Sequence, residues 1–409
     1  MNLLNLLTTS ANNYTVGVTP VNAGELSGIG WVIGWIFDLF SNFYGAVALG
    51  VIVFTIALKT LVLPLDIYSR VKTKKQSLLM ERMRPQMEKL QKQYANDKNM
   101  YQQKVMELQK ANGYNPLGAC LPMIVSLVIF MIILTSFNNY SNYAVLRDYS
   151  EMAKAYNDSV AVYVMENEED TDISHFLIKS DEGEGYKVYF DKFAEYRAND
   201  EGFNKEEFLA KDSHDQWEVV SSFIEVNARK SSAEWYRSNS DGIHFGWIGN
   251  LWYPDSMLNK EVPAYDKFSS ATTRANVTVS QVEYDKVTYD LSVEKDTYNG
   301  YFVLIVLSIG LMFLQQFIMM KSQKAANELS SVDGSAAKTN KWMMIIMPII
   351  FGLFSFMYSA AFSVYMITNT LYGLISMLIV NKVVTVRFAN KEIKTASSNR
   401  PSNRAKRLK

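Results

Sequence analysis

The sequence predicts an all-α polytopic membrane protein with five spanning helices, a helical hairpin on one side of the membrane and an enlarged α+β insert on the other. Two observations support this fold class: long apolar runs recur along the chain, and basic and acidic residues occupy different segments. The overall composition hides both features, because 48% hydrophobic residues and a net charge of +0 also describe an ordinary soluble protein.

Five apolar runs are long enough to cross a membrane. A hydrocarbon core about 30 Å thick requires roughly 20 helical residues. The predicted spans are residues 45–65, 117–137, 300–320, 342–359 and 361–381.

The distribution of charge predicts the orientation, because short loops rich in Lys and Arg remain in the cytoplasm. Segment 66–112 holds 11 Lys+Arg against 5 Asp+Glu, loop 321–341 holds 4 against 2, and tail 382–409 holds 9 against 1. Segment 138–299 holds 16 against 31, which gives a net charge of −15. We therefore expect a cytoplasmic C-terminus, an extracytoplasmic insert and an extracytoplasmic N-terminal tail over residues 1–30.

The first residues lack the cationic n-region and full apolar h-region of a cleaved signal peptide, so the first helix is expected to insert uncleaved. Cys120 is the only cysteine and lies in an apolar run, which predicts a small buried hydrophobe and no disulfide. The three histidines, His175, His214 and His244, lack ligand spacing. No metal or cofactor is predicted.

Residues 31–44 predict an amphipathic helix in the membrane interface. At 100° per residue, one narrow face that is expected to point toward water carries Gly34, Asp38, Ser41, Asn42 and Gly45. Aromatic and branched side chains cover the remainder. A wide apolar sector with several Trp and Phe is typical of helices that lie in the interface plane. The alternative is an extension of the first spanning helix.

The cytoplasmic segment 66–112 predicts an antiparallel helical hairpin with its turn at NDKN, residues 96–99. Pro85 is expected to kink its first arm. The apolar stripe that includes Met83, Met87 and Leu90 has two interpretations. It can join the two arms, or it can offer varied apolar segments a methionine-lined surface.

The insert 138–299 is expected to combine helices with short strands and to act as a solvated structural or docking module. A helical continuation is predicted for 142–156, strands for 161–167, 175–180 and 186–191, and helices over 206–236. The aromatic stretch FGWIGNLWYPDS near its end is typical of a membrane interface.

The tail 382–409 combines Ser, Asn and Pro with cationic residues and shows no apolar periodicity, which predicts disorder. Its charge suits RNA phosphates, as on a ribosome, or anionic lipids. It lacks interleaved aromatic residues for base stacking, so no sequence-specific nucleic-acid binding is predicted. The tail can equally serve only to hold the topology.

Several motifs resemble the YidC-type membrane protein insertases, the family that includes the mitochondrial and chloroplast insertases. TIALKTLVLPL leads into the basic hairpin, and NPLGACLPM begins the second span. WIGNLWYPDS closes the insert, FLQQFIM lies in the third span, and WMMIIMPIIFGLFSFMYSAAFSVYMITN crosses the last two. The family joins its second and third helices by a short loop, so the insert is a departure.

The resemblance implies a five-helix insertase core in the bacterial cell membrane, around a water-filled groove that opens to the cytoplasm and to lipid. It implies a chaperone for nascent membrane proteins and no enzyme. The Sec translocon is a further partner to consider. Water and a cation in such a groove lower the cost of moving a polar segment across hydrocarbon.

The resemblance assigns a groove role to Lys59, which occupies the place of a family arginine. A lysine keeps the charge but loses the planar, bidentate guanidinium. The alternative is snorkelling, because Lys59 lies about 9 Å along the helix from Leu65 and its stem can reach the interface.

Other groove candidates from the resemblance are Thr55, Gln315, Gln316, Tyr365, Thr368 and Asn369. Each has a structural alternative. The threonines can bond their own helix backbone, the tyrosine can serve packing, and Thr368 and Asn369 can bond neighbouring helices.

Two other functions remain open from the residues alone. A transporter or channel requires paired repeats with discontinuous helices, and the helix and loop lengths show no such symmetry. A receptor with the acidic outer domain as sensor requires a cytoplasmic output domain, and only the hairpin, a small loop and the tail are predicted there.

Overall fold

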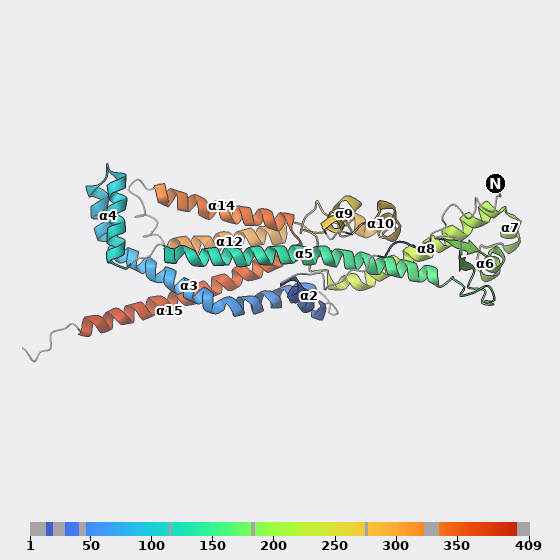
Figure 1. The fold of residues 1–409 in the computed structure, drawn as a ribbon, viewed down its shortest axis with the longest axis horizontal. Helices are drawn as coiled ribbons and strands as arrows, with labels where there is room; N and C mark the ends of the chain where they lie inside the picture. Colours follow the sequence, from blue (N-terminus) through green and yellow to red (C-terminus); the bar gives the residue numbers. More distant parts are fainter. Residues whose placement is uncertain are drawn as a thin grey trace, which may run out of the picture.

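The computed structural model describes residues 14–18, 29–40, 46–113, 117–180, 185–274, 277–322 and 335–398. The protein is elongated, with a helical bundle in the middle, a hairpin at one end and the insert at the other (Figure 1). It is mostly helical, and the strands named in the described residues form one two-stranded sheet.

The bundle consists of α3 (Ala46–Gln93), α5 (Leu117–Ala161), α12 (Val303–Ser322), α14 (Ser335–Met357) and α15 (Ala360–Ser398). Three stretches in the described part of the chain are long and apolar enough to cross a membrane, and these are Val47–Lys72, Val303–Lys321 and Ala360–Arg387. The other two expected spans fall in α5 and α14. Nothing is described of the side chains of residues 114–127, which include Cys120.

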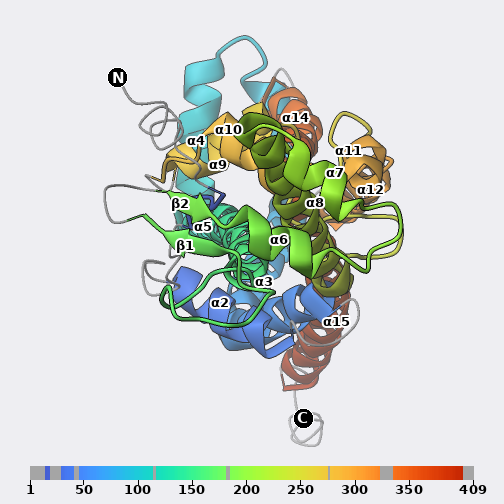
Figure 2. The same cartoon turned by 90° about the vertical axis from the view of Figure 1, so that its right-hand side faces the viewer.

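Helix α2 (Ile29–Phe40) is separate from α3 and lies across the long axis of the bundle. It is seen at length in Figure 2 and end-on in Figure 1. Ile33 and Phe37 are buried, whereas Trp31 and Trp35 are exposed. One face therefore packs on the bundle, and the other presents indole rings of the kind that favour a membrane interface. Gly34, expected on the face toward water, is buried, whereas the Asp38 side chain and residues Ser41, Asn42 and Gly45 lie outside what the structure describes.

The hairpin consists of the end of α3 and α4 (Lys98–Ala111). Asp97 caps α4 by accepting a hydrogen bond from the Met100 backbone N–H at 2.9 Å. Pro85 lies within α3, which continues as helix to Gln93. Met80, Met83, Met87, Tyr101 and Val105 form a separate buried core between the two arms, with Leu90 partly buried against it. The structure thus places Met83 and Met87 in the core of the hairpin and not on its surface.

The insert is built on an antiparallel helix pair. Helix α5 runs on to Ala161, and α8 (Ser213–Asn239) returns beside it (Figure 1). At the far end lie β1 (Leu177–Lys179), β2 (Tyr186–Val188), α6 (Phe190–Tyr196) and α7 (Lys205–Ala210). Nearer the bundle lie α9 (Tyr265–Arg274), α10 (Gln281–Val287) and α11 (Ser292–Asp296). The predicted strand at 161–167 is reduced to a single bridge between Val164 and Leu177.

A buried polar clamp joins the insert to α12. The Asp255 carboxylate accepts hydrogen bonds from the backbone N–H groups of Tyr301, Phe302 and Leu304 at 2.7, 3.1 and 2.6 Å, and so caps the start of α12. An added Cβ on Gly300 would overlap this carboxylate, so the close approach requires glycine.

The Asn299 side chain holds the other side of the clamp. It bonds both the N–H and the C=O of Asn250, at 2.6 and 2.9 Å, and donates to two further carbonyls of the same loop. The loop in turn accepts hydrogen bonds from the backbone of Ala360 and Ala361 at the start of α15. The loop therefore fixes the starts of α12 and α15 together.

Asp255→Ala is expected to destabilise the protein by several kcal/mol, because charge-assisted hydrogen bonds contribute about 1.5–3 kcal/mol each and three backbone N–H groups, that of Leu304 buried, would lose their acceptor. Thermal unfolding of the full chain in detergent measures the change. Asp296→Ala, at an exposed position, is the matched control. Equal melting of both variants would show that the clamp is dispensable.

Met87→Ala is expected to loosen the hairpin alone, because truncating a fully buried methionine costs about 2–5 kcal/mol. Hydrogen exchange should accelerate in α4 and the end of α3 and remain unchanged in α12. Met106→Ala removes the same atoms from an exposed position of α4 and should leave exchange as in the wild type. Faster exchange in the control as well would contradict a core confined to the facing side chains.

Candidate functional site

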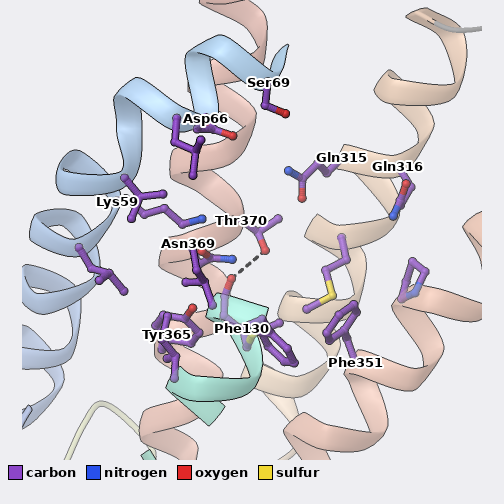
Figure 3. A pocket seen from close by; sticks show the side chains of 18 residues that line it. Lys59, Asp66, Ser69, Phe130, Gln315, Gln316, Phe351, Tyr365, Asn369 and Thr370 are labelled. Carbon is purple, nitrogen blue, oxygen red and sulfur yellow. Dashed lines mark hydrogen bonds between the residues drawn. The ribbon is translucent and has the colours of Figure 1, made fainter. Parts of the chain in front are cut away.

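A cavity of about 310 Å³ lies inside the bundle, with side chains contributed by all five bundle helices. Figure 3 shows its polar groups on α3, α12 and α15, opposite aromatic rings from α5 and α14. The predicted residues that line it are Lys59, Gln315, Gln316, Tyr365 and Asn369. Positions far apart in the sequence therefore meet in one cavity.

Lys59 extends from α3 into this cavity, toward Asn369 and Thr370 of α15 (Figure 3). Its ammonium group forms no hydrogen bond or ion pair with any residue that the structure describes. An unpaired charge surrounded by hydrocarbon is costly, so this group requires water or a charged ligand.

The amides of α12 and α15 supply further polar groups to the cavity. Gln316 Oε1 and Asn369 Oδ1 are buried and have no hydrogen-bond partner among the described residues. Gly373 permits the approach of Gln315, since a Cβ there would lie 3.0 Å from Gln315 Nε2. Buried amides without partners are costly, so water or a peptide group in the cavity would stabilise them.

An acidic residue that the sequence analysis assigned to the hairpin also lines the cavity. Asp66 accepts hydrogen bonds from Arg70 Nε at 2.8 Å and from the Ser376 hydroxyl at 3.2 Å. It was missed because the apolar run ends at Leu65, whereas α3 continues unbroken past it. Its spacing of seven residues from Lys59, about two helical turns, is the signal that could have found it.

Aromatic and apolar side chains form the remaining wall. Phe130 of α5 meets Phe351 of α14 edge to face, with ring centroids 4.8 Å apart. Tyr365 packs against Phe137 with centroids 5.2 Å apart. The cavity is therefore amphipathic, with a polar side on which Lys59 lies and an aromatic side.

Two predicted residues lie outside the lining. Thr55 is completely buried, and its hydroxyl donates to the Val51 carbonyl at 2.6 Å. The Thr368 hydroxyl donates to the Val364 carbonyl at 2.9 Å. Both threonines satisfy their own helices, which is the structural alternative for this residue type.

The bundle is closed between the cavity and the insert by aromatic packing. Phe37, Phe137, Tyr140 and Trp252 are buried there, with ring centroids 5.0–6.3 Å apart in the pairs that they form. Edge-to-face pairs of this kind fill space densely. The described residues contain no group of three or more His, Cys, Asp or Glu placed to hold a metal ion.

Comparison with known proteins identifies the family. Residues 39–166 and 239–387 match the family described as the 60Kd inner membrane protein. The unmatched stretch between them contains α6, α7 and most of α8, so the outer part of the insert is absent from the family pattern.

Curated relatives are named membrane protein insertase YidC. The chain is 35% identical to the protein of Leptospira interrogans over 113 residues, which are 28% of this chain and 17% of the relative. It is 35% identical to that of Fusobacterium nucleatum over 97 residues, 24% of this chain and 45% of the relative. It is 36% identical to that of Oceanobacillus iheyensis over 107 residues, 25% and 40% respectively.

Each of these matches spans less than half of the relative's length, and no solved structure matches the chain. The family match nevertheless covers both halves of the bundle, including every helix that lines the cavity. The chain belongs to the 60Kd inner membrane protein family, the family of the YidC-type insertases.

Proposed function

We propose that the protein inserts nascent membrane proteins into the bacterial cell membrane, with the amphipathic cavity as the site where a client's polar segment enters. The observation that carries the proposal is the unpaired ammonium group of Lys59 in a cavity that all five bundle helices line. These helices lie in the part of the chain that matches the insertase family. Insertion by this route requires no covalent step.

The proposed topology has five spans, with the hairpin and C-terminal tail in the cytoplasm and the insert outside. The hairpin and insert lie at opposite ends of the bundle (Figure 1), which supports their placement on opposite sides of the membrane. The excess of Lys and Arg in 66–112 and 382–409 assigns that end to the cytoplasm.

The polar wall lowers the barrier to translocation. A client's acidic segment that enters beside Lys59 exchanges bulk water for an ammonium group and amides, and so avoids hydrocarbon. The aromatic packing between the cavity and the insert keeps the hydrated path short and closed on the outer side. The remaining distance through hydrocarbon is smaller than the full bilayer.

The surroundings of the cavity suit the apolar part of a client. Leu314 and Phe317 are exposed on α12, beside the cavity residues Gln315 and Gln316. Exposed apolar side chains on a spanning helix contact lipid, so a client helix can leave the polar wall and enter the bilayer along this face.

The charged pair near the cavity completes the proposed path. The Asp66 carboxylate, held by Arg70 and Ser376, lies on the same helix as Lys59 and further toward the hairpin. Arg70 neutralises the Asp66 carboxylate, so an acidic client segment passes this pair without net repulsion and reaches the positive charge of Lys59.

We further propose that the basic tail contacts the ribosome or anionic lipids, and that the protein works alone or beside the Sec translocon. The charge of the tail supports the first suggestion. The hairpin acts through its outer surface, because its methionine core is buried.

Lys59→Ala is expected to lower insertion of a single-span client with an acidic translocated segment by roughly tenfold, equivalent to about 1.4 kcal/mol in the barrier. Lys59→Arg should retain activity, because the charge is kept. Protease protection of ribosome-made client in proteoliposomes measures insertion. A client with a neutral segment should depend less on Lys59.

Lys382→Ala removes an exposed lysine of α15 and is the matched control. Equal insertion by Lys59→Ala, Lys59→Arg and the wild type would show that Lys59 only snorkels. Solute flux without insertion by the wild type would instead support a transporter or channel.

A further inference from the structure

A short segment near the N-terminus, Tyr14–Val18, is held against the insert, far along the sequence from every residue that it contacts. It is described as a non-helical stretch, and Tyr14 and Val16 are buried whereas Gly17 and Val18 are exposed. Burial at alternate positions is typical of an extended peptide seated in a groove.

The amide side chain of Asn157 on α5 recognises the backbone of this segment at both of its polar groups. The Val16 N–H donates to Asn157 Oδ1 at 2.9 Å, and Asn157 Nδ2 donates to the Val16 carbonyl at 2.9 Å. Contacts to the main chain are available from any peptide residue other than proline. This pair of bonds therefore selects an extended backbone and not a particular sequence.

A second backbone contact comes from the start of α10. The Gly17 N–H donates to Glu283 Oε1 at 2.9 Å, while Glu283 Oε2 accepts from the Ser280 backbone and hydroxyl in a capping box. The carboxylate is thus fixed before the segment arrives. A Cβ on Gly17 would lie 3.0 Å from Glu283 Oε1, so a small residue is favoured there.

The two buried side chains define what the groove selects. The Tyr14 hydroxyl lies 3.3 Å from the Ser221 hydroxyl of α8, and its ring centroid is 6.0 Å from that of Tyr186. Burial raises the pKa of Tyr14 to about 12. Val16, two residues on, fills the second buried position. From Tyr14 to Gly17, the sequence pattern that the groove accepts is an aromatic residue, any residue, a β-branched residue and glycine.

We propose that the insert contains a binding groove for extended peptides, between α5, α8 and the start of α10, that takes translocated client segments of this pattern and is filled by the protein's own segment Tyr14–Val18 in their absence. The assignment to clients rests on the proposed function, whereas the binding of peptide does not. The insert lies beyond the end of the bundle opposite the hairpin, where the proposed topology delivers translocated segments (Figure 1).

Because Tyr14–Val18 is part of the same chain as the groove, it competes with client segments for binding. Only residues 19–28 separate it from α2, which raises its effective concentration at the groove. A client segment must therefore displace it, and removing its anchors should open the groove to peptide added in solution.

Fluorescence anisotropy of a labelled peptide of residues 12–20, NNYTVGVTP, tests the groove in the purified full chain. The variant Tyr14→Ala/Val16→Ala should bind it saturably, and more tightly than the wild type does. Adding Asn157→Asp should weaken binding at least about tenfold, because an acceptor then faces the Val16 carbonyl of the peptide. Asn227→Ala, an amide on α8 that bonds only its own helix in the described structure, should change nothing.

Failure of the opened variant to bind, with its unfolding unchanged, would overturn the proposal. So would equal binding of a peptide with alanine at both anchor positions, or binding that Asn157→Asp leaves intact. Each result would show that the groove does not bind an extended peptide through its backbone and the two side chains that correspond to Tyr14 and Val16.

A photo-crosslinking residue in place of Ser221 tests the client assignment. In proteoliposomes it should crosslink a client whose translocated segment contains the pattern more than one with alanine at both anchors. Peptide binding with equal crosslinking of both clients would overturn the assignment to clients. Loss of protease-protected client in the wild type would instead contradict the insertase function, independently of peptide binding.

Discussion

An ammonium group on a membrane-spanning helix has to be kept hydrated or paired, and the bundle is arranged around that requirement. Lys59 lies in a stretch that is otherwise apolar, yet its side chain extends into a cavity that amides from α12 and α15 also line. An isolated lysine facing lipid would be far costlier. The five helices therefore leave an amphipathic cavity in an otherwise apolar assembly, and the proposed function uses that cavity.

The proposed function requires a cavity that is closed on one side, and the clamp around Asp255 and Asn299 lies where it can serve that purpose. It fixes the starts of α12 and α15 to one loop, while Phe137 and Trp252 fill the space beneath. Because the hydrogen bonds are buried and geometrically specific, they hold these helices at fixed positions. On the opposite side, side-chain hydrogen bonds such as that from Ser376 to Asp66 join α15 to α3, and α3 continues into the hairpin.

Much of the helical framework could be predicted from the sequence, because apolar length and turn residues are local signals. Asp97 begins α4 within the predicted turn, and the predicted continuation of the second span is the long helix α5. The cavity was predicted less completely. Polar residues inside apolar runs can be recognised from the sequence, and this holds for Lys59, Gln315, Gln316 and Asn369. Asp66 follows such a run and was therefore assigned to the cytoplasmic hairpin segment.

The remaining differences concern contacts between distant segments. The stripe of Met83 and Met87 is compatible with an exposed surface or a core, and only the position of α4 decides between them. Tyr14–Val18 resembles an ordinary tail, because its partners Asn157 and Glu283 lie 141 and 266 residues away in sequence. No local pattern marks such a docking site.

The most direct test of the central claim is the water accessibility of position 59. A Lys59→Cys variant in a Cys120→Ser background carries one thiol, which a membrane-impermeant maleimide can label in sealed vesicles of either orientation. A hydrated cavity that opens only to the cytoplasm predicts labelling from the cytoplasmic side alone, at a rate that falls when a client occupies the cavity. Labelling from the outer side, or from neither side, would contradict a hydrated cavity that is closed on its outer side.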